Sequence, residues 1–288
     1  GSRGIYTLRI DAETGIAKIM STAPAYNTGC LALSQDGGNL YAAAEGMTFD
    51  GYADGGVMAF RVNQDGSLHR LNGQRSYGQR TWSAYALQEN GALSPARLVV
   101  APPEASAWKA LHCIGTIEED YVGVISLAEC ALVVYRGDTG VRVTSFSFPH
   151  NPFPRYFAAV DDTIYAMMQS PDEIYVFQSH LKENGGLELI QKVRLLDDAH
   201  PAIPATSTIR VTPDRKLVLA ANRPSNTITV YTRNPNGTLT PERVAEIPGN
   251  GPRDFNISGD GALVVAAMQH SDEVFVLKLD AYEKTLIP

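Results

Sequence analysis

The chain has 288 residues, of which 44% are hydrophobic and 19% charged, and its 31 acidic against 24 basic residues give a formal net charge of -7. That balance argues against nucleic acid or an anionic membrane surface as the main partner, and no apolar run approaches the roughly 18 residues that cross a bilayer. The three cysteines lack CxxC spacing and stand among apolar neighbours, so we expect buried, reduced thiols in a cytoplasmic protein rather than a disulfide framework or a zinc site.

One sequence pattern recurs seven times along the chain. Each copy has an aliphatic or aromatic residue, a large hydrophobic residue three positions later, a turn that usually contains glycine, and a second apolar stretch. The copies begin at Ile5, Val57, Trp82, Leu132, Ile174, Ile228 and Val274. β-Branched and aromatic residues suit a pleated strand, and Asn-Gly or Asp-Gly supplies the positive φ of a tight turn. Each copy therefore predicts a β-hairpin.

A second kind of hairpin precedes most copies and ends in small residues, mostly alanine. Examples run from Leu31 to Ala44, from Ile209 to Ala221 and from Phe255 to Ala267. Two hairpins make a four-stranded blade, and a ring of blades leaves few exposed edges. We therefore predict an all-β fold, a seven-bladed β-propeller of four-stranded antiparallel blades, as a single domain over residues 1–288. A two-sheet sandwich would not produce seven near-equal repeats.

The spacing of the copies has one irregularity. Val57 and Trp82 are separated by only about half the usual distance in the sequence. We infer that an inner hairpin is missing between about residues 71 and 81, and another before residue 4. A propeller without these hairpins would expose its core, so we expect that segments have been left out of this sequence.

The inner hairpins also predict where a binding site lies. The first strand of each hairpin leaves one mouth of the central channel and the second strand returns to it, so opening and closing residues should meet there. The opening positions hold His112, Arg155 and Arg253, and the closing positions hold Glu45, Ser126, Gln169, Arg223 and Gln269. Three of the closing residues, Gln169, Arg223 and Gln269, stand five residues before the first residue of the next repeat.

These residue types point to a small anionic ligand. Arginine forks bind carboxylate or phosphate in a bidentate manner, and a histidine can accept a proton from water near neutral pH. Alternatively, the arginines are ties between blades that donate to backbone carbonyls, and a single histidine is more often structural. The shared register favours the binding site. No GxSxG, HExxH or P-loop pattern is present, so we expect neither a metal nor a cofactor.

Several of these segments resemble one known family. Pro252-Arg253-Asp254-Phe255 with the following strand, Pro213-Asp214 through Arg223, His112 with its strand, and Pro154-Arg155-Tyr156-Phe157 occur in the order found in lactonase-type seven-bladed propellers. The resemblance covers essentially the whole chain. That family includes 6-phosphogluconolactonase and the fungal carboxymuconate-lactonizing enzyme, which work without metal.

The resemblance implies an active site. His112 would be the general base that activates water, and Arg155 and Arg223 would hold the anionic substrate and the developing oxyanion, with Arg253 nearby. From their place at the same mouth of the channel, we expect Arg253, Gln169, Glu45 and Gln269 to contribute to substrate binding. The sequence departs from the family, which commonly has glutamate at Gln169, an acidic residue at Ser126 and often histidine at Tyr156. Glutamine cannot accept a proton, which puts an acid–base role at that position in doubt.

Two functions from different classes follow. The first is hydrolysis of a small anionic sugar lactone, in the manner of 6-phosphogluconolactonase. The second is a non-catalytic propeller that binds a small ligand or a protein through the same mouth. His112 and the arginines favour the enzyme, whereas Gln169 and Ser126 favour the binding protein. A carboxymuconate cycloisomerase would use the same residues. The sequence carries no indication of the oligomeric state.

Overall fold

Every regular element in the described part of the chain is a β-strand. The computed structural model describes residues 4–25, 27–44, 55–76, 81–101, 111–150, 152–200 and 205–288. The chain divides into two compact units, Gly1–Ala105 and Ser106–Pro288, named here the first unit and the second unit. No helix in the described ranges is long and apolar enough to cross a membrane.

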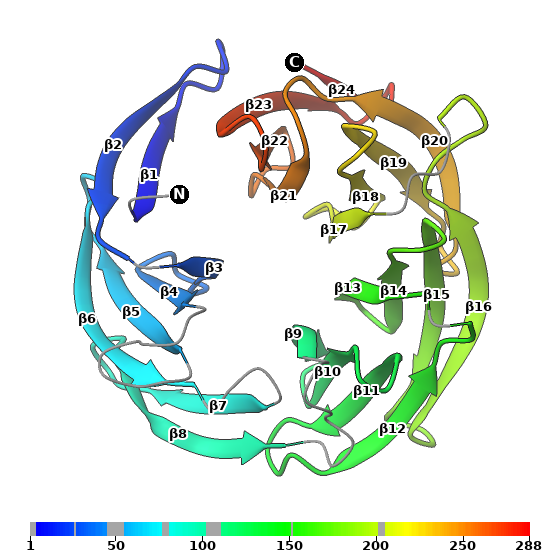
Figure 1. Ribbon diagram of the computed structural model, residues 1–288, viewed down its shortest axis with the longest axis horizontal. Coiled ribbons are helices and arrows are strands. Elements are labelled where there is room, and N and C mark those ends of the chain that lie inside the picture. The colour runs from blue at the N-terminus through cyan, green and yellow to red at the C-terminus, as the bar shows by residue number, and fades with distance from the viewer. Residues whose placement is uncertain are drawn as a thin grey trace. The chain divides into compact units, whose positions relative to one another are not determined.

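The second unit contains four blades. Each blade is an antiparallel sheet whose strands pair in chain order from an inner to an outer strand, and the inner strands of successive blades lie side by side (Figure 1). The blades are β9 (Leu111–Ile117), β10 (Tyr121–Ser126), β11 (Ala131–Arg136) and β12 (Arg142–Ser147); β13 (Pro154–Val160), β14 (Thr163–Met168), β15 (Glu173–His180) and β16 (Gly186–Arg194); β17 (Thr206–Val211), β18 (Leu217–Asn222), β19 (Thr227–Arg233) and β20 (Leu239–Glu246); β21 (Pro252–Ile257), β22 (Leu263–Met268), β23 (Glu273–Asp280) and β24 (Thr285–Ile287).

The first unit contains one four-stranded blade and two two-stranded sheets. The blade is β3 (Thr28–Leu33), β4 (Asn39–Ala44), β5 (Gly56–Val62) and β6 (Leu68–Arg75), and the smaller sheets are β1 (Ile5–Ile10) with β2 (Ala17–Ala23) and β7 (Trp82–Leu87) with β8 (Leu93–Val100). The Asn72 side chain ties β6 to β8, since its Nδ2 donates to the Leu93 carbonyl at 2.7 Å and its Oδ1 accepts from the Leu93 N–H at 3.0 Å.

The predicted hairpins are all present within the described ranges. The seven repeats form the hairpins β1–β2, β5–β6, β7–β8, β11–β12, β15–β16, β19–β20 and β23–β24. The two repeats predicted to lack an inner hairpin, β1–β2 and β7–β8, are the two-stranded sheets. The chain is therefore an all-β propeller with four-stranded antiparallel blades.

The prediction that all three cysteines are buried is wrong for Cys30. Cys113 is buried and Cys130 half-buried, but Cys30 is exposed. It lies on β3, where Leu31 and Leu33 are also 49% and 63% exposed. An apolar neighbourhood in sequence predicts burial only where another sheet covers that strand.

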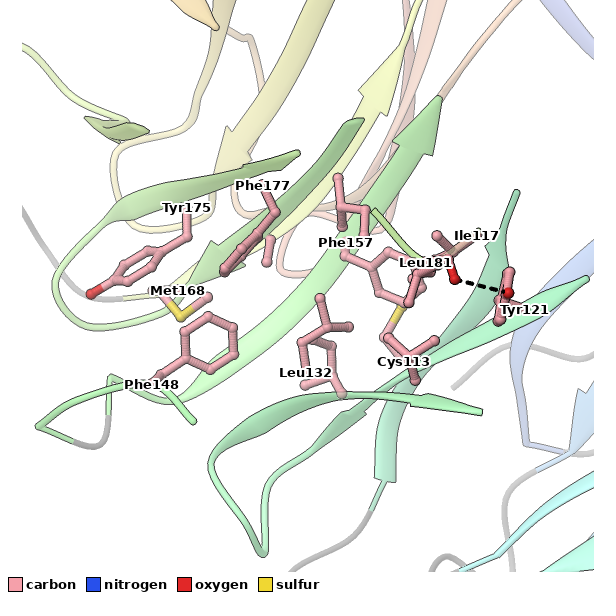
Figure 2. Packing of buried hydrophobic residues seen from close by; sticks show 14 residues of the cluster. Cys113, Ile117, Tyr121, Leu132, Phe148, Phe157, Met168, Tyr175, Phe177 and Leu181 are labelled. Carbon is pink, nitrogen blue, oxygen red and sulfur yellow. Dashed lines mark hydrogen bonds between the residues drawn. The ribbon is translucent and has the colours of Figure 1, made fainter. Parts of the chain in front are cut away.

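The cores of the second unit lie between neighbouring blades, as expected where sheets pack face to face. Between the β9–β12 and β13–β16 blades, the rings of Phe146 and Phe148 pack edge-to-face against Phe177, with centroids 4.8 Å and 6.3 Å apart. Figure 2 shows this cluster, including the hydrogen bond from the Tyr121 hydroxyl to the Leu181 carbonyl at 3.1 Å. This packing fixes the first two inner strands of the unit relative to each other.

We expect Phe177→Ala to lower the free energy of unfolding by about 3–5 kcal/mol, because it empties a ring-sized volume in this cluster. Phe177 is fully buried, at 0% exposure. The midpoint of urea unfolding measures the loss. Phe153→Ala is the matched control, since Phe153 is 57% exposed and its truncation should change the free energy by less than about 0.5 kcal/mol. Equal losses in the two variants would contradict this account of the core.

A turn glycine illustrates how local sequence and blade packing depend on each other. Gly237, in the turn between β19 and β20, has a φ of 81°, which favours glycine. A Cβ at this position would come within 2.6 Å of the Thr163 Oγ1 of the preceding blade, and the Gly237 carbonyl accepts a hydrogen bond from the Tyr165 hydroxyl at 2.9 Å. The Asn-Gly turn is thus also a contact between blades.

Candidate active site

A β-bulge recurs near the start of the inner strands in the second unit. The pairing register shifts between Leu111 and Cys113 in β9, between Pro154 and Tyr156 in β13, between Thr206 and Ile209 in β17, and between Pro252 and Asp254 in β21. The equivalent bulge residues are His112, Arg155, Ser207 and Arg253. A bulge re-aims side chains and is common beside functional sites. The three predicted opening residues therefore occupy the equivalent position in their three blades.

The closing residues follow the ends of the second strands. Gln169, Arg223 and Gln269 come directly after β14, β18 and β22. Their backbone N–H groups donate to carbonyls that precede the inner strand of the same blade, at Phe153, Ala205 and Gly251 respectively, at 3.0, 3.3 and 2.8 Å. The shared register predicted for these three residues is confirmed.

Ser126 does not share that register. It is the last residue of β10 and pairs with Leu111 and Ala131, as Asn222 pairs with Thr206 and Thr227 in the third blade of the unit. Leu127, one residue later, is equivalent to Arg223. The Ser126 side chain is 1% exposed, and its Oγ accepts from the Glu129 N–H at 3.2 Å. Ser126 is therefore a buried loop-closing residue, and its predicted place among the closing residues is wrong.

Two further residues, Glu45 and Gln269, were predicted to contribute to the site. Glu45 lies outside the described residues. Gln269 is exposed, and within the described ranges no contact joins its side chain to the arginines. The residues that the structure does bring together are His112, Arg155, Arg223 and Arg253, named here the basic rim.

Arg155 is the most firmly held member of the basic rim. It is 8% exposed. Its Nε donates to the Ser207 carbonyl at 3.1 Å, and its Nη1 lies 3.4 Å from the Gln169 Oε1. Burial and the charges of Arg253 and Arg223 lower the pKa of Arg155 to about 10, against a smaller opposing effect of Asp254. The guanidinium therefore remains charged at neutral pH, in a position fixed by the next blade.

Arg223 and Arg253 are less buried. The Arg223 Nε donates to the Ala205 carbonyl at 3.2 Å, and burial followed by the Arg253 charge lowers the pKa of Arg223. Arg253 is exposed, and no described residue forms an ion pair with either side chain. Arg253 and Arg223 lower the pKa of Arg155, and Arg253 lowers that of Arg223, so the three guanidinium groups make a strongly positive site, which an anion would stabilise.

His112 stands in the field of this positive charge. Burial among the surrounding protein atoms, then the charges of Arg155 and Arg253, lower the pKa of His112 to about 4, while a backbone hydrogen bond at Arg155 opposes the shift. The side chain nevertheless keeps a large exposed fraction. His112 is therefore a neutral imidazole at physiological pH, accessible to water and able to accept a proton.

Sequence reasoning missed two polar residues beside the basic rim. Ser207 occupies the bulge position of β17, where a serine carries no distinguishing signal in the sequence. Asp254 lies next to Arg253, and its Oδ1 accepts from the Arg210 Nη2 at 3.0 Å. Arg210 lies over the Tyr156 ring, 4.9 Å from its centroid. The bulge exposes both Arg253 and Asp254, although strict strand alternation would bury one of them.

Among the described residues, no group of three or more His, Cys, Asp or Glu side chains could hold a metal ion. The chemistry available at the basic rim is that of three cationic hydrogen-bond donors and one neutral imidazole. Such donors can hold an anion, and such an imidazole can accept a proton.

A buried carboxyl group lies in the loop after Gln169. Asp172 is 4% exposed, and its carboxyl group lies beside the Ala205 backbone and the Asn222 side chain. Burial raises the pKa of Asp172 to about 6, although the Ala205 backbone and the Asn222 side chain oppose the shift. The folded state therefore favours the neutral carboxyl group.

We expect this carboxyl to make stability fall as pH rises. Below pH 3.8 the Asp172 carboxyl is protonated in both the folded and the unfolded chain. Between pH 3.8 and about 6 it loses its proton only in the unfolded chain. This difference in ionisation lowers the free energy of unfolding by up to about 3 kcal/mol at pH 7. Asp172→Asn should remove this loss, so it should be more stable than the wild type at pH 7 and about equal near pH 4 by urea unfolding. Asp198→Asn, at an exposed aspartate, should show no such pH-dependent difference. A parallel pH dependence of wild type and Asp172→Asn would contradict the assignment.

The blades define a β-propeller, and its basic rim combines three guanidinium groups with an imidazole. Residues 1–93 and 76–287 match the family model described as "Lactonase, 7-bladed beta-propeller". The chain belongs to this lactonase family.

Relatives of known name are similar over most of the chain. The 6-phosphogluconolactonase of Bacillus subtilis is 26% identical over 314 residues, covering 97% of this chain and 88% of the relative. Two solved structures share the fold: a periplasmic gluconolactonase of Pseudomonas aeruginosa, with a TM-score of 0.87, 19% identity and coverage of 100% of this chain and 91% of that one, and a Lactobacillus plantarum protein, with a TM-score of 0.86, 20% identity and coverage of 99% and 90%. The comparisons support a lactonase-like function.

Proposed function

We propose that this protein hydrolyses the lactone of a small anionic sugar acid at the basic rim. The observation that carries the proposal is the shared bulge position of His112, Arg155 and Arg253, with Arg223 close enough to lower the pKa of Arg155. A neutral base beside three cationic donors suits the attack of water on the carbonyl group of a negatively charged substrate.

Each member of the basic rim has a proposed role. The less buried Arg223 and Arg253 bind the anionic group of the substrate, because their guanidinium groups are available to solvent. Arg155, held by the Ser207 carbonyl at 3.1 Å, faces the lactone carbonyl oxygen. Gln169 contributes an amide next to Arg155, and Gln269 lies at the edge of the site.

The proposed reaction needs one proton carrier. His112 accepts a proton from water while the water oxygen bonds to the lactone carbonyl carbon, and the carbonyl oxygen becomes an oxyanion beside Arg155. When the tetrahedral intermediate collapses, the bond from the carbonyl carbon to the ring oxygen breaks, and the imidazolium returns its proton to that oxygen. The products are the open-chain acid and a regenerated neutral His112.

We propose 6-phosphogluconolactone as the substrate. The Bacillus subtilis relative carries the name 6-phosphogluconolactonase, and the phosphate of that compound matches a site with three arginines. Gluconolactone, which lacks the phosphate, is the natural comparison. We expect its kcat/KM to be about a hundredfold lower, because the contacts of the phosphate with two arginines are lost.

A pH-stat assay tests the proposal. Purified protein is given freshly prepared 6-phosphogluconolactone, and proton release is compared with spontaneous hydrolysis. Arg223→Ala should lose most of the added rate. Arg215→Ala is the matched control, because Arg215 lies at the opposite end of the same β17–β18 hairpin and pairs with Asp161 at 2.6 Å. No rate above the spontaneous one, or equal rates in both variants, would remove the proposed function.

The second candidate is a non-catalytic anion-binding propeller. Gln169 favours it, because an amide at 3.4 Å from the Arg155 Nη1 can neither take up a proton nor balance the arginine charge. Calorimetric titration with 6-phosphogluconate separates the two candidates: binding without turnover of the lactone supports the second, and turnover supports the first.

We further propose that the whole chain is one seven-bladed domain. Seven outer hairpins within the described residues and the family description of seven blades support this number. Scanning calorimetry should then show a single cooperative unfolding transition. Two separate transitions would indicate independent domains.

A further inference from the structure

The bulge position of β17 holds a serine where three other blades hold the basic residues of the rim. Ser207 is 2% exposed, so its hydroxyl is not available to a substrate. Its strand, β17, lies between β13, which carries Arg155, and β21, which carries Arg253, and these are the inner strands of the two neighbouring blades (Figure 1). Its surroundings indicate a role in holding these two residues.

Ser207 contacts both neighbouring blades through different atoms. Its carbonyl oxygen accepts from the Arg155 Nε at 3.1 Å. Its Oγ donates to the carbonyl of Pro252 at 2.6 Å, with a longer approach of 3.4 Å to the Ala221 carbonyl of its own blade. Pro252 immediately precedes Arg253. One buried serine therefore connects a guanidinium on one side to the backbone beside a second arginine on the other.

We propose that Ser207 is a positioning residue that fixes Arg155 and Arg253 relative to each other. The inference rests on the proposed function, since it assigns these arginines to one substrate. Without the Oγ–H, the buried Pro252 carbonyl loses the hydrogen bond from Ser207, and the loss of a buried hydrogen bond is unfavourable. The β17 and β21 bulges then separate to admit water, which moves the Ser207 carbonyl away from the Arg155 Nε.

The test compares two buried hydroxyl groups. Ser207→Ala removes the bond to Pro252. Thr229→Val is the matched control, because Thr229 is also 2% exposed and its Oγ1 donates to the Leu195 carbonyl at 2.7 Å, away from the basic rim. Both variants lose one buried hydroxyl-to-carbonyl bond, so both should lose similar stability.

Only Ser207→Ala should alter the site. We expect its kcat/KM for lactone hydrolysis to fall about ten- to a hundredfold, as small misplacements of substrate-holding groups do, and the Arg155 Nε–H signal in a 1H–15N spectrum to shift and exchange faster with water. Ser207→Cys keeps a hydrogen-bond donor, so it should partly restore both kcat/KM and the Arg155 Nε–H signal. Equal effects of Ser207→Ala and Thr229→Val on kcat/KM, or an unchanged Arg155 signal in Ser207→Ala, would overturn the inference.

The spectroscopic measurement separates this inference from the proposed function. If the wild type hydrolyses no lactone, the proposed function fails, and the positioning role is then judged by the Arg155 signal and by titration with inorganic phosphate. Weaker phosphate binding in Ser207→Ala with an altered Arg155 signal would support positioning. Unchanged phosphate binding would overturn it. If Ser207→Ala does not fold, Ser207→Cys gives the same comparison at smaller amplitude.

Discussion

Replacing His112 with alanine should lower kcat/KM for lactone hydrolysis by about a hundred- to ten-thousandfold, the usual contribution of a positioned general base. His112 is the described imidazole whose pKa both Arg155 and Arg253 depress, so it is the group that can take the proton of the attacking water. The measurement is the initial rate of proton release by the purified variant. His69→Ala, at an exposed histidine of the first unit, should retain wild-type activity. Full activity in His112→Ala would end its role as the base.

The pH profile gives an independent check on the same residue. Only the neutral imidazole accepts a proton, and the pKa of His112 is lowered to about 4. For gluconolactone, which has no titrating phosphate, we therefore expect kcat/KM to stay level as pH falls from 7 to 5 and to decline only as pH falls through about 4. An unperturbed histidine would give a decline near 6.5. A fall centred at 6.5 would show that the base is a different group or that the rim charges do not act on it.

The hairpins of this fold are predictable because their signals are local. Alternating β-branched and aromatic residues followed by a glycine turn define β15–β16 or β19–β20 from a dozen adjacent residues. The register of Gln169, Arg223 and Gln269 was equally accessible, since each stands at a fixed distance from the repeat that follows. Counting back from Leu132 by the same rule gives Leu127. The strand pairing agrees, because Ser126 is the last residue of β10 and lies one position before the register of the other closing residues.

The bulges are harder to predict because they depend on pairing between strands. A bulge adds one unpaired residue and changes which side chains share a face, so alternation along β21 does not reveal that Arg253 and Asp254 are both exposed. Ser207 was missed for a related reason. Its importance comes from the Pro252 and Arg155 contacts on either side, and a buried serine in a strand carries no distinguishing sequence signal.

Burial of single polar groups was also beyond the sequence. Asp172 follows Ser170 and Pro171 in the loop between β14 and β15, and it is 4% exposed in the structure. Whether such a loop is covered depends on the neighbouring blade, which supplies Ala205 and Asn222 around the carboxyl. Tertiary packing, rather than local composition, decides the solvent exposure of this loop.

The second large effect is expected at Arg155, where geometry and charge can be separated. The Arg155 guanidinium contacts the Ser207 carbonyl and Gln169 and still has a donor for the substrate. Arg155→Lys keeps the positive charge but loses this forked set of donors. We expect kcat to fall about a hundred- to a thousandfold, as when one donor to an oxyanion is removed. The acidic limb of the pH profile should remain near 4, because the charge that depresses the pKa of His112 is retained. Arg136→Lys, at an arginine paired with Asp138 on the surface, should leave kcat unchanged.

Arg155→Met removes the charge as well. Loss of a positive neighbour favours protonation of the imidazole, so the pKa of His112 should rise and the acidic limb of the residual activity should move to higher pH. The two variants should therefore share a low kcat and differ in their pH profiles. Identical acidic limbs in the lysine and methionine variants would mean that Arg155 does not set the protonation of His112. A wild-type kcat in Arg155→Lys would mean that its fork does not face the reacting carbonyl.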